Sequence, residues 1–133
     1  MDARNTTLSE GEIQNLAVCT LSKLKTLTQV ADNFTTDDIV LIGNILSKMG
    51  FLQSEFSIAL LKLSIAYNEI ALSDLALPAE VRVFAEHGFP IMQRLANNKE
   101  VRLTQLFKFI CDKKVHFADV KTALNQILLT ITK

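Results

Sequence analysis

The chain has 133 residues, of which 49% are apolar and 21% are charged, with only four glycines and two prolines. This composition excludes a disordered or collagen-like chain, and the length suits a single domain that buries its own core. The formal net charge of zero combines an acidic part, with six Lys and Arg against eleven Asp and Glu in residues 1–93, and a basic part, with eight against three in residues 94–133. Such a division is found in proteins that bind nucleic acid or an acidic partner, but more often the two parts complement each other within one fold.

The first predicted helix begins after Ser9. Ser9 and Glu12 have the spacing of a capping box, in which each side chain binds the backbone N–H of the other residue. Apolar residues then recur every three or four positions from Ile13 to Ala31, which predicts an amphipathic helix. Residues 1–8 lack this periodicity, so we expect an extended or disordered N-terminus.

The second and third predicted helices have broad apolar faces. Thr35 and Asp38 repeat the capping pattern, and Gly50 stands where the second helix should end. The third predicted helix spans residues 54–72 and has two apolar faces. The first face consists of Phe56, Ala59, Leu60, Leu63, Tyr67 and Ile70, and the second of Ile58, Leu61, Ile65 and Leu72. A helix that is apolar nearly all round normally lies in the middle of a bundle, although the second face would also suit a partner's binding surface.

The remaining predicted helices are short, except the last. Pro78 suits the first turn of a helix that Gly88 ends, and a further short helix follows over residues 91–96. Asn97 and Glu100 predict the start of the next helix, and the last helix spans residues 117–131. No strand pattern or linker appears. We therefore predict one all-α domain over residues 1–133, an irregular bundle of about seven helices with the helix at 54–72 central and the first, second and last helices packed around it.

No motif for catalysis, metal binding or cofactor binding is present. His87 and His116 have no evident orienting partner, and Cys111, five residues before His116, gives only a weak thiolate–imidazole pattern. The glycines are too scattered for a phosphate loop, and the acidic residues do not have calcium-loop spacing. We therefore predict that the protein is not an enzyme and uses no cofactor or metal.

The sequence also predicts a cytoplasmic location. Residues 1–15 lack the apolar run of a signal peptide, and the most apolar stretch, 56–66, is interrupted by Lys62 and shorter than the roughly 20 residues that cross a bilayer. We expect no membrane span. In a reducing compartment, Cys19 and Cys111 should behave as small buried apolar residues and should not form a disulfide.

Two classes of function remain. The first is a non-enzymatic protein–protein interaction module, such as an adaptor, chaperone or regulator, that acts through apolar helix faces and self-associates as a homodimer. Its predicted partner-binding residues are Phe56, Leu60, Tyr67, Phe84, Phe89 and Met92. The same residues at helical spacing would equally suit a packed core.

The second class is a nucleic-acid-binding regulator with a helix-turn-helix in the basic part, at about residues 99–131. Its second helix would present Lys121, Asn125 and Gln126 to bases or phosphates. This class is the weaker of the two, because Lys121 is the only cation in that helix and the whole chain is not strongly basic.

Overall fold

The computed structural model describes residues 8–51 and 53–131, and these residues form seven α-helices and no strand. The helices are α1 (Glu10–Leu27), α2 (Thr36–Lys48), α3 (Gln53–Ser73), α4 (Pro78–Glu86), α5 (Ile91–Lys99), α6 (Leu103–Cys111) and α7 (Phe117–Ile131). The prediction of an all-α bundle of about seven helices is confirmed. Of the N-terminus predicted to be extended or disordered, residues 1–7 lie outside the described residues, whereas Leu8 packs against the core.

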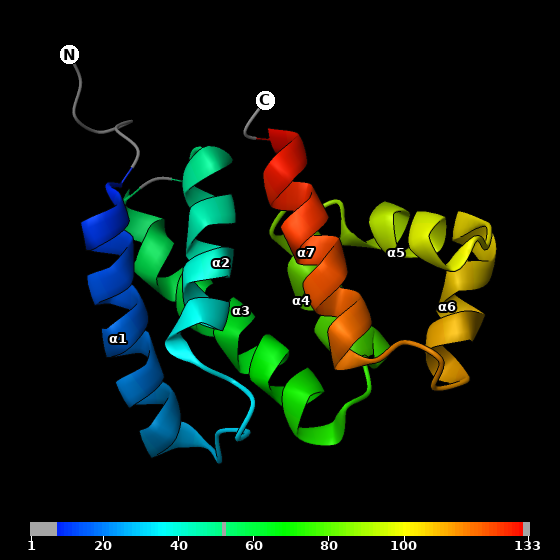
Figure 1. Cartoon of the computed structure of the whole chain (residues 1–133), viewed down its shortest axis with the longest axis horizontal. Coiled ribbons are helices and arrows are strands. Elements are labelled where there is room, and N and C mark those ends of the chain that lie inside the picture. The colour runs from blue at the N-terminus through cyan, green and yellow to red at the C-terminus, as the bar shows by residue number, and fades with distance from the viewer. Residues whose placement is uncertain (1–7, 52, 132–133) are drawn as a thin grey trace.

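The long helix α3 is central to the bundle. It packs against α1, α2 and α4, and its Tyr67 ring meets that of Phe117 at the start of α7, with centroids 4.8 Å apart. Helices α1 and α2 lie side by side and run in opposite directions, while α5 and α6 form one end of the molecule (Figure 1). Helix α7 packs mainly on α2 and α5, and less extensively on α3 than predicted.

The two apolar faces of α3 lie in different surroundings. The first face is buried in the core, whereas the second reaches the surface, with Ile58 60% exposed and Leu72 38% exposed. By length and composition, α3 would be able to cross a membrane, and no other helix among the described residues meets this test. However, 56% of its apolar window is buried, as in the core helix of a folded bundle.

Aromatic rings pack at the centre of the core beside α3. Tyr67 lies edge-on to Phe34 and Phe84, with centroids 5.7 and 6.1 Å away, and Phe84 contacts Phe89 at 5.6 Å. All four of these side chains are at most 4% exposed. Edge-to-face ring pairs contribute about 0.5–1.5 kcal/mol beyond the burial of their area, so this cluster holds α3, α4 and the loop before α2 together.

The predicted starts of α1 and α2 are formed as capping boxes. The Glu12 carboxylate accepts a hydrogen bond from the Ser9 N–H at 2.8 Å, and Ser9 Oγ accepts one from the Glu12 N–H at 3.2 Å. Asp38 accepts a hydrogen bond from the Thr35 N–H at 2.8 Å. These contacts satisfy N–H groups that have no partner within their own helix.

The glycine stops are also confirmed, but the third predicted cap is wrong. Gly50 and Gly88 have φ angles of 81° and 87°, in the left-handed region that ends α2 and α4. In contrast, Asn97 lies within the last turn of α5, where its carbonyl accepts the Glu100 N–H, and Glu100 is left-handed with a φ of 58°. Because the chain turns at Glu100, α6 begins only after Arg102.

Helix α1 ends at Leu27 and not at Ala31, because buried Asn68 of α3 holds the next segment away from a helical path. The Asn68 Oδ1 atom accepts the Ala31 N–H at 2.9 Å, and Nδ2 donates to the Gln29 carbonyl at 2.8 Å. A helix through this segment would use those backbone groups for its own bonds. The Asn68 side chain therefore favours the end of α1 at Leu27.

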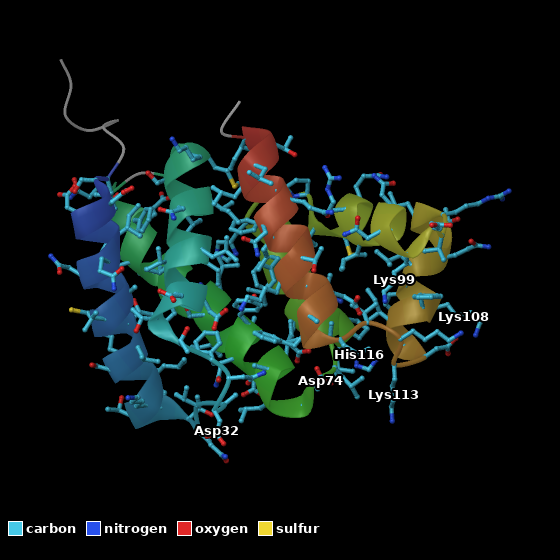
Figure 2. All side chains as sticks on the ribbon, in the orientation of Figure 1. Asp32, Asp74, Lys99, Lys108, Lys113 and His116 are labelled. Atoms are coloured by element: carbon cyan, nitrogen blue, oxygen red, sulfur yellow. The ribbon has the colours of Figure 1, made fainter. Side chains whose placement is uncertain are left out.

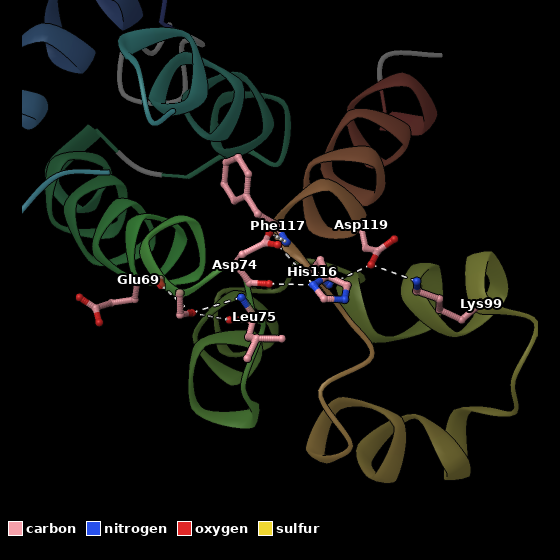
Figure 3. A network of polar contacts seen from close by, with 8 residues as sticks. Glu69, Asp74, Leu75, Lys99, His116, Phe117 and Asp119 are labelled. Carbon is pink, nitrogen blue, oxygen red and sulfur yellow. Dashed lines mark hydrogen bonds and ion pairs between the residues drawn. The ribbon is translucent and has the colours of Figure 1, made fainter. Parts of the chain in front are cut away.

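A polar junction joins the loop after α3 to the start of α7 (Figure 3). Asp74 has a left-handed backbone, with a φ of 57°, and its carboxylate accepts the Phe117 N–H at 3.3 Å. The Nδ1 atom of His116 lies 2.9 Å from the Asp74 carbonyl. Asp119 accepts the His116 N–H at 2.8 Å and forms an ion pair with Lys99 at 3.0 Å. The first turn of α7 is thus capped partly by a distant loop.

Tyr67 has a buried hydroxyl that lacks a hydrogen-bond partner among the described residues. Burial raises the pKa of this phenol above its ordinary value of 10.0, and the charge of Asp38 acts in the same direction. The unfolded chain therefore releases this proton near pH 10 while the folded protein keeps it. The free energy of unfolding falls as the pH rises above that value, because the folded state then binds more protons than the unfolded state.

This behaviour gives a prediction that absorbance measures directly, since the chain has one tyrosine and no tryptophan. During an alkaline titration, phenolate absorbance should rise together with the loss of helical circular dichroism, above pH 10. The Tyr67→Phe variant should lose that part of the pH dependence. A phenolate signal that appears near pH 10 with helicity intact would contradict the prediction.

Candidate functional site

Five of the six residues predicted to bind a partner lie in the core. They are Phe56, Leu60, Tyr67, Phe84 and Phe89, each at most 3% exposed. A partner does not reach these side chains in the folded protein, so the interpretation of these five as an interface is corrected in favour of core packing. Their helical spacing arises from burial against neighbouring helices. Met92 differs, because it is half-buried at the surface of α5.

Met92 lies in an apolar groove between α4 and α6, which we call the α4–α6 groove. The groove has a volume of about 200 Å³. Its lining residues are Pro78, Val81, Arg82 and Ala85 of α4, Met92 of α5, and Phe107 and Ile110 of α6. Six of the seven are apolar, which is the lining expected of a site that takes apolar side chains.

The α4–α6 groove has a buried floor and an exposed wall. Val81 and Ile110 are 2% and 0% exposed, whereas Phe107 is 58% exposed. Leu103, one turn before Phe107 on the same helix face, is 49% exposed. Large apolar side chains that gather at a hollow on the surface mark a binding site more strongly than isolated ones do.

Helix α6 presents this wall because its apolar residues exceed the face that it can bury. Leu106 and Ile110 are four residues apart and fully buried against the bundle. Leu103 and Phe107 have the same spacing but lie on the adjacent face, where they are 49% and 58% exposed. In the sequence, these four residues form one apolar stripe at helical spacing. The sequence feature that could have distinguished the exposed pair from the buried pair is that a helix of only nine residues carries two apolar pairs, each spaced by four residues.

The charge at the α4–α6 groove comes from Arg82. Among residues 8–51 and 53–131, no acidic side chain forms an ion pair with Arg82. Glu80, on the same helix, does not line the groove and instead accepts the Leu77 N–H at 2.9 Å. Burial raises the pKa of the Glu80 carboxyl, the Glu69 charge adds to the rise, and the Leu77 N–H opposes it.

The histidines and cysteines have structural or solvent-exposed positions. His87 caps α4, with Nδ1 2.8 Å from the Val83 carbonyl, and its ring stacks on Phe51. Cys19 and Cys111 are free, as expected, but both are exposed, contrary to the prediction that they are buried. In the described part of the chain, no group of three or more His, Cys, Asp or Glu side chains is placed to hold a metal ion.

The polar side chains of the predicted recognition helix have partners within the protein. The Lys121 Nζ atom lies 3.5 Å from the Asp38 carboxylate, which is only 2% exposed. Gln126 accepts a hydrogen bond from Asn98 at 2.7 Å, and Asn125 donates to the Lys121 carbonyl. Nucleic-acid binding by α7 would have to break or share these contacts, so the structure gives this prediction no added support.

Comparisons with protein-family models, with curated protein sequences and with solved structures each found no match for this chain.

Proposed function

We propose that this protein is a non-enzymatic interaction module of the cytoplasm, an adaptor, chaperone or regulator that binds apolar side chains of a partner protein in the α4–α6 groove. The observation that supports the proposal is the 58% exposure of Phe107 on the wall of a groove whose floor is apolar and buried. Met92, half-buried on α5, is the predicted partner-binding residue that belongs to this surface.

The exposed apolar side chains at the groove suit the centre of a protein interface. Fully burying an exposed phenylalanine side chain contributes about 1.5–3 kcal/mol. Interfaces concentrate their binding energy in a few such anchors, surrounded by contacts that exclude water. Phe107, Leu103 and Met92 can serve as these anchors, and the groove beside them receives a side chain from the partner.

Affinity purification of the full chain from the cells that naturally produce it tests the proposal. At least one protein should co-purify with the wild-type chain and be depleted at least about tenfold by Phe107→Glu, because a buried charge without a partner is costly. Circular dichroism should show unchanged helicity, since Phe107 is exposed.

Ile58→Glu is the matched control, because Ile58 on the outer face of α3 is 60% exposed and receives the same charge. The co-purifying protein should remain bound to this variant. If the co-purifying protein is lost with Ile58→Glu and kept with Phe107→Glu, the interface lies on α3 and the proposal is contradicted. The proposal is also contradicted if both variants retain the same co-purifying proteins as the wild-type chain. Sedimentation of the purified chain at several concentrations tests self-association, and a dimer that Phe107→Glu dissociates would identify the partner as a second copy.

A further inference from the structure

The charged residue that lines the α4–α6 groove is cationic. Arg82 is its single charged lining residue and has no acidic partner among the described residues. Arg102 stands at the start of α6, and Lys113 follows its end, where both are exposed. Figure 2 shows Lys108 and Lys113 pointing away from the bundle at the α6 end of the molecule. Arg82 therefore offers positive charge inside the groove beside an apolar wall, and further cations lie elsewhere on and beside α6.

The acidic side chains of the same region are engaged elsewhere or lie outside the groove. Asp112 pairs with Lys108 at 2.9 Å, and Glu80 caps the start of α4. Glu86 lies one turn beyond Arg82 on α4, but it does not line the groove and forms no ion pair with Arg82 in the described part of the chain. Arg82 is thus available to a carboxylate of a partner.

We propose that the partner presents an acidic amphipathic helix, with an apolar side chain that enters the α4–α6 groove beside Phe107 and a carboxylate that pairs with Arg82. This inference rests on the proposed function. A mostly apolar groove between two helices is the kind of site that amphipathic helices occupy. Complementary charge at the rim sets the orientation of such a helix and speeds its association.

The concave shape favours a helix over an anionic membrane surface. The floor residues Val81 and Ile110 are buried, so a ligand reaches them only by inserting a side chain between the two helices. A bilayer surface would instead contact the exposed Leu103 and Phe107 side chains and leave the floor empty. The floor is therefore the part of the site that a protein helix uses and a membrane does not.

Selection from a displayed library of amphipathic helical peptides, with the full chain as target, tests this inference. The enriched peptides should carry apolar residues at helical spacing and at least one Asp or Glu flanking them. For the tightest peptide, Arg82→Glu should weaken binding about tenfold and Arg82→Gln about threefold, with a steeper salt dependence for the wild-type protein. Ala85→Trp, which fills the groove, should also abolish binding.

Lys62→Glu is the control for overall charge, because Lys62 is exposed on α3 and undergoes the same charge reversal as Arg82. It should change affinity less than about twofold, because Lys62 does not line the groove and salt screens exposed charges that make no direct contact with the ligand. Circular dichroism of the Arg82 variants checks that their helicity is unchanged.

The possible outcomes separate this inference from the proposed function. Peptides that require Phe107 but lack acidic residues and bind Arg82→Glu equally well would overturn the acidic-helix inference and leave the proposed function standing. A selection that yields no peptide whose binding depends on Phe107 or Ala85 would overturn both the acidic-helix inference and the proposed function. Binding to vesicles of anionic phospholipid that Phe107→Glu abolishes, or a dimer that Arg82→Glu dissociates, would replace the helix with a membrane or a second copy of the chain.

Discussion

Phe84→Ala is expected to lower the free energy of unfolding by about 3–5 kcal/mol, the cost of removing a buried ring from a packed core. Phe84 is 0% exposed and lies between the rings of Tyr67 and Phe89, with centroid distances of 6.1 and 5.6 Å. Its removal deletes both ring pairs and leaves a cavity that the short helix α4 can only partly close. Urea unfolding followed by circular dichroism measures the change.

Phe107→Ala is the matched control, because it makes the same change at a ring that is 58% exposed. It should cost less than about 1 kcal/mol, as surface substitutions usually do, while it weakens binding at the α4–α6 groove. Equal destabilisation by the two substitutions would mean that α6 packs against a part of the protein that buries Phe107. A stable Phe84→Ala variant that loses a partner would restore Phe84 to the interface and refute its assignment to the core.

Asn68→Ala is expected to lower the free energy of unfolding by about 2–4 kcal/mol. The substitution leaves the Ala31 N–H and the Gln29 carbonyl without their side-chain partner, and an unsatisfied buried polar group costs about 1–3 kcal/mol. The effect should be concentrated in the segment between α1 and α2. Hydrogen exchange should show the Ala31 amide losing most of its protection.

Asn125→Ala provides the comparison, because Asn125 is exposed and, among the described residues, its side-chain amide bonds only to the Lys121 carbonyl one turn earlier in α7. Its stability change should be within about 0.5 kcal/mol. If the two alanine variants unfold at the same urea concentration, water replaces the Asn68 amide, and the side chain does not determine the path of the chain after α1.

Much of the fold was predictable because its boundaries are local. The capping residues Ser9 and Thr35 and the stops Gly50 and Gly88 act within one helical turn, so the sequence alone locates them. The end of α1 was not predictable in this way. It depends on Asn68, which lies 37 residues beyond Ala31 and within an apolar run that shows no sign of its role.

The candidate site was predictable only in part. Apolar periodicity identified residues that leave water, but it did not distinguish burial against another helix of this chain from burial against a partner. Tyr67 and Phe84 were therefore assigned to a surface although both are fully buried. Phe107 has the helical spacing of a core residue, yet it is 58% exposed. Only the packed arrangement of α4, α5 and α6 shows which face of a short helix stays open.

The junction at Asp74 has a consequence for the order in which the protein forms. The cap on the Phe117 N–H comes from 43 residues earlier in the chain, and α7 by itself has 15 residues, a length at which an isolated helix is marginal in water. During synthesis the Asp74 loop leaves the ribosome before α7. The nascent α7 can therefore dock onto a cap that is already in place, instead of waiting for a segment not yet made.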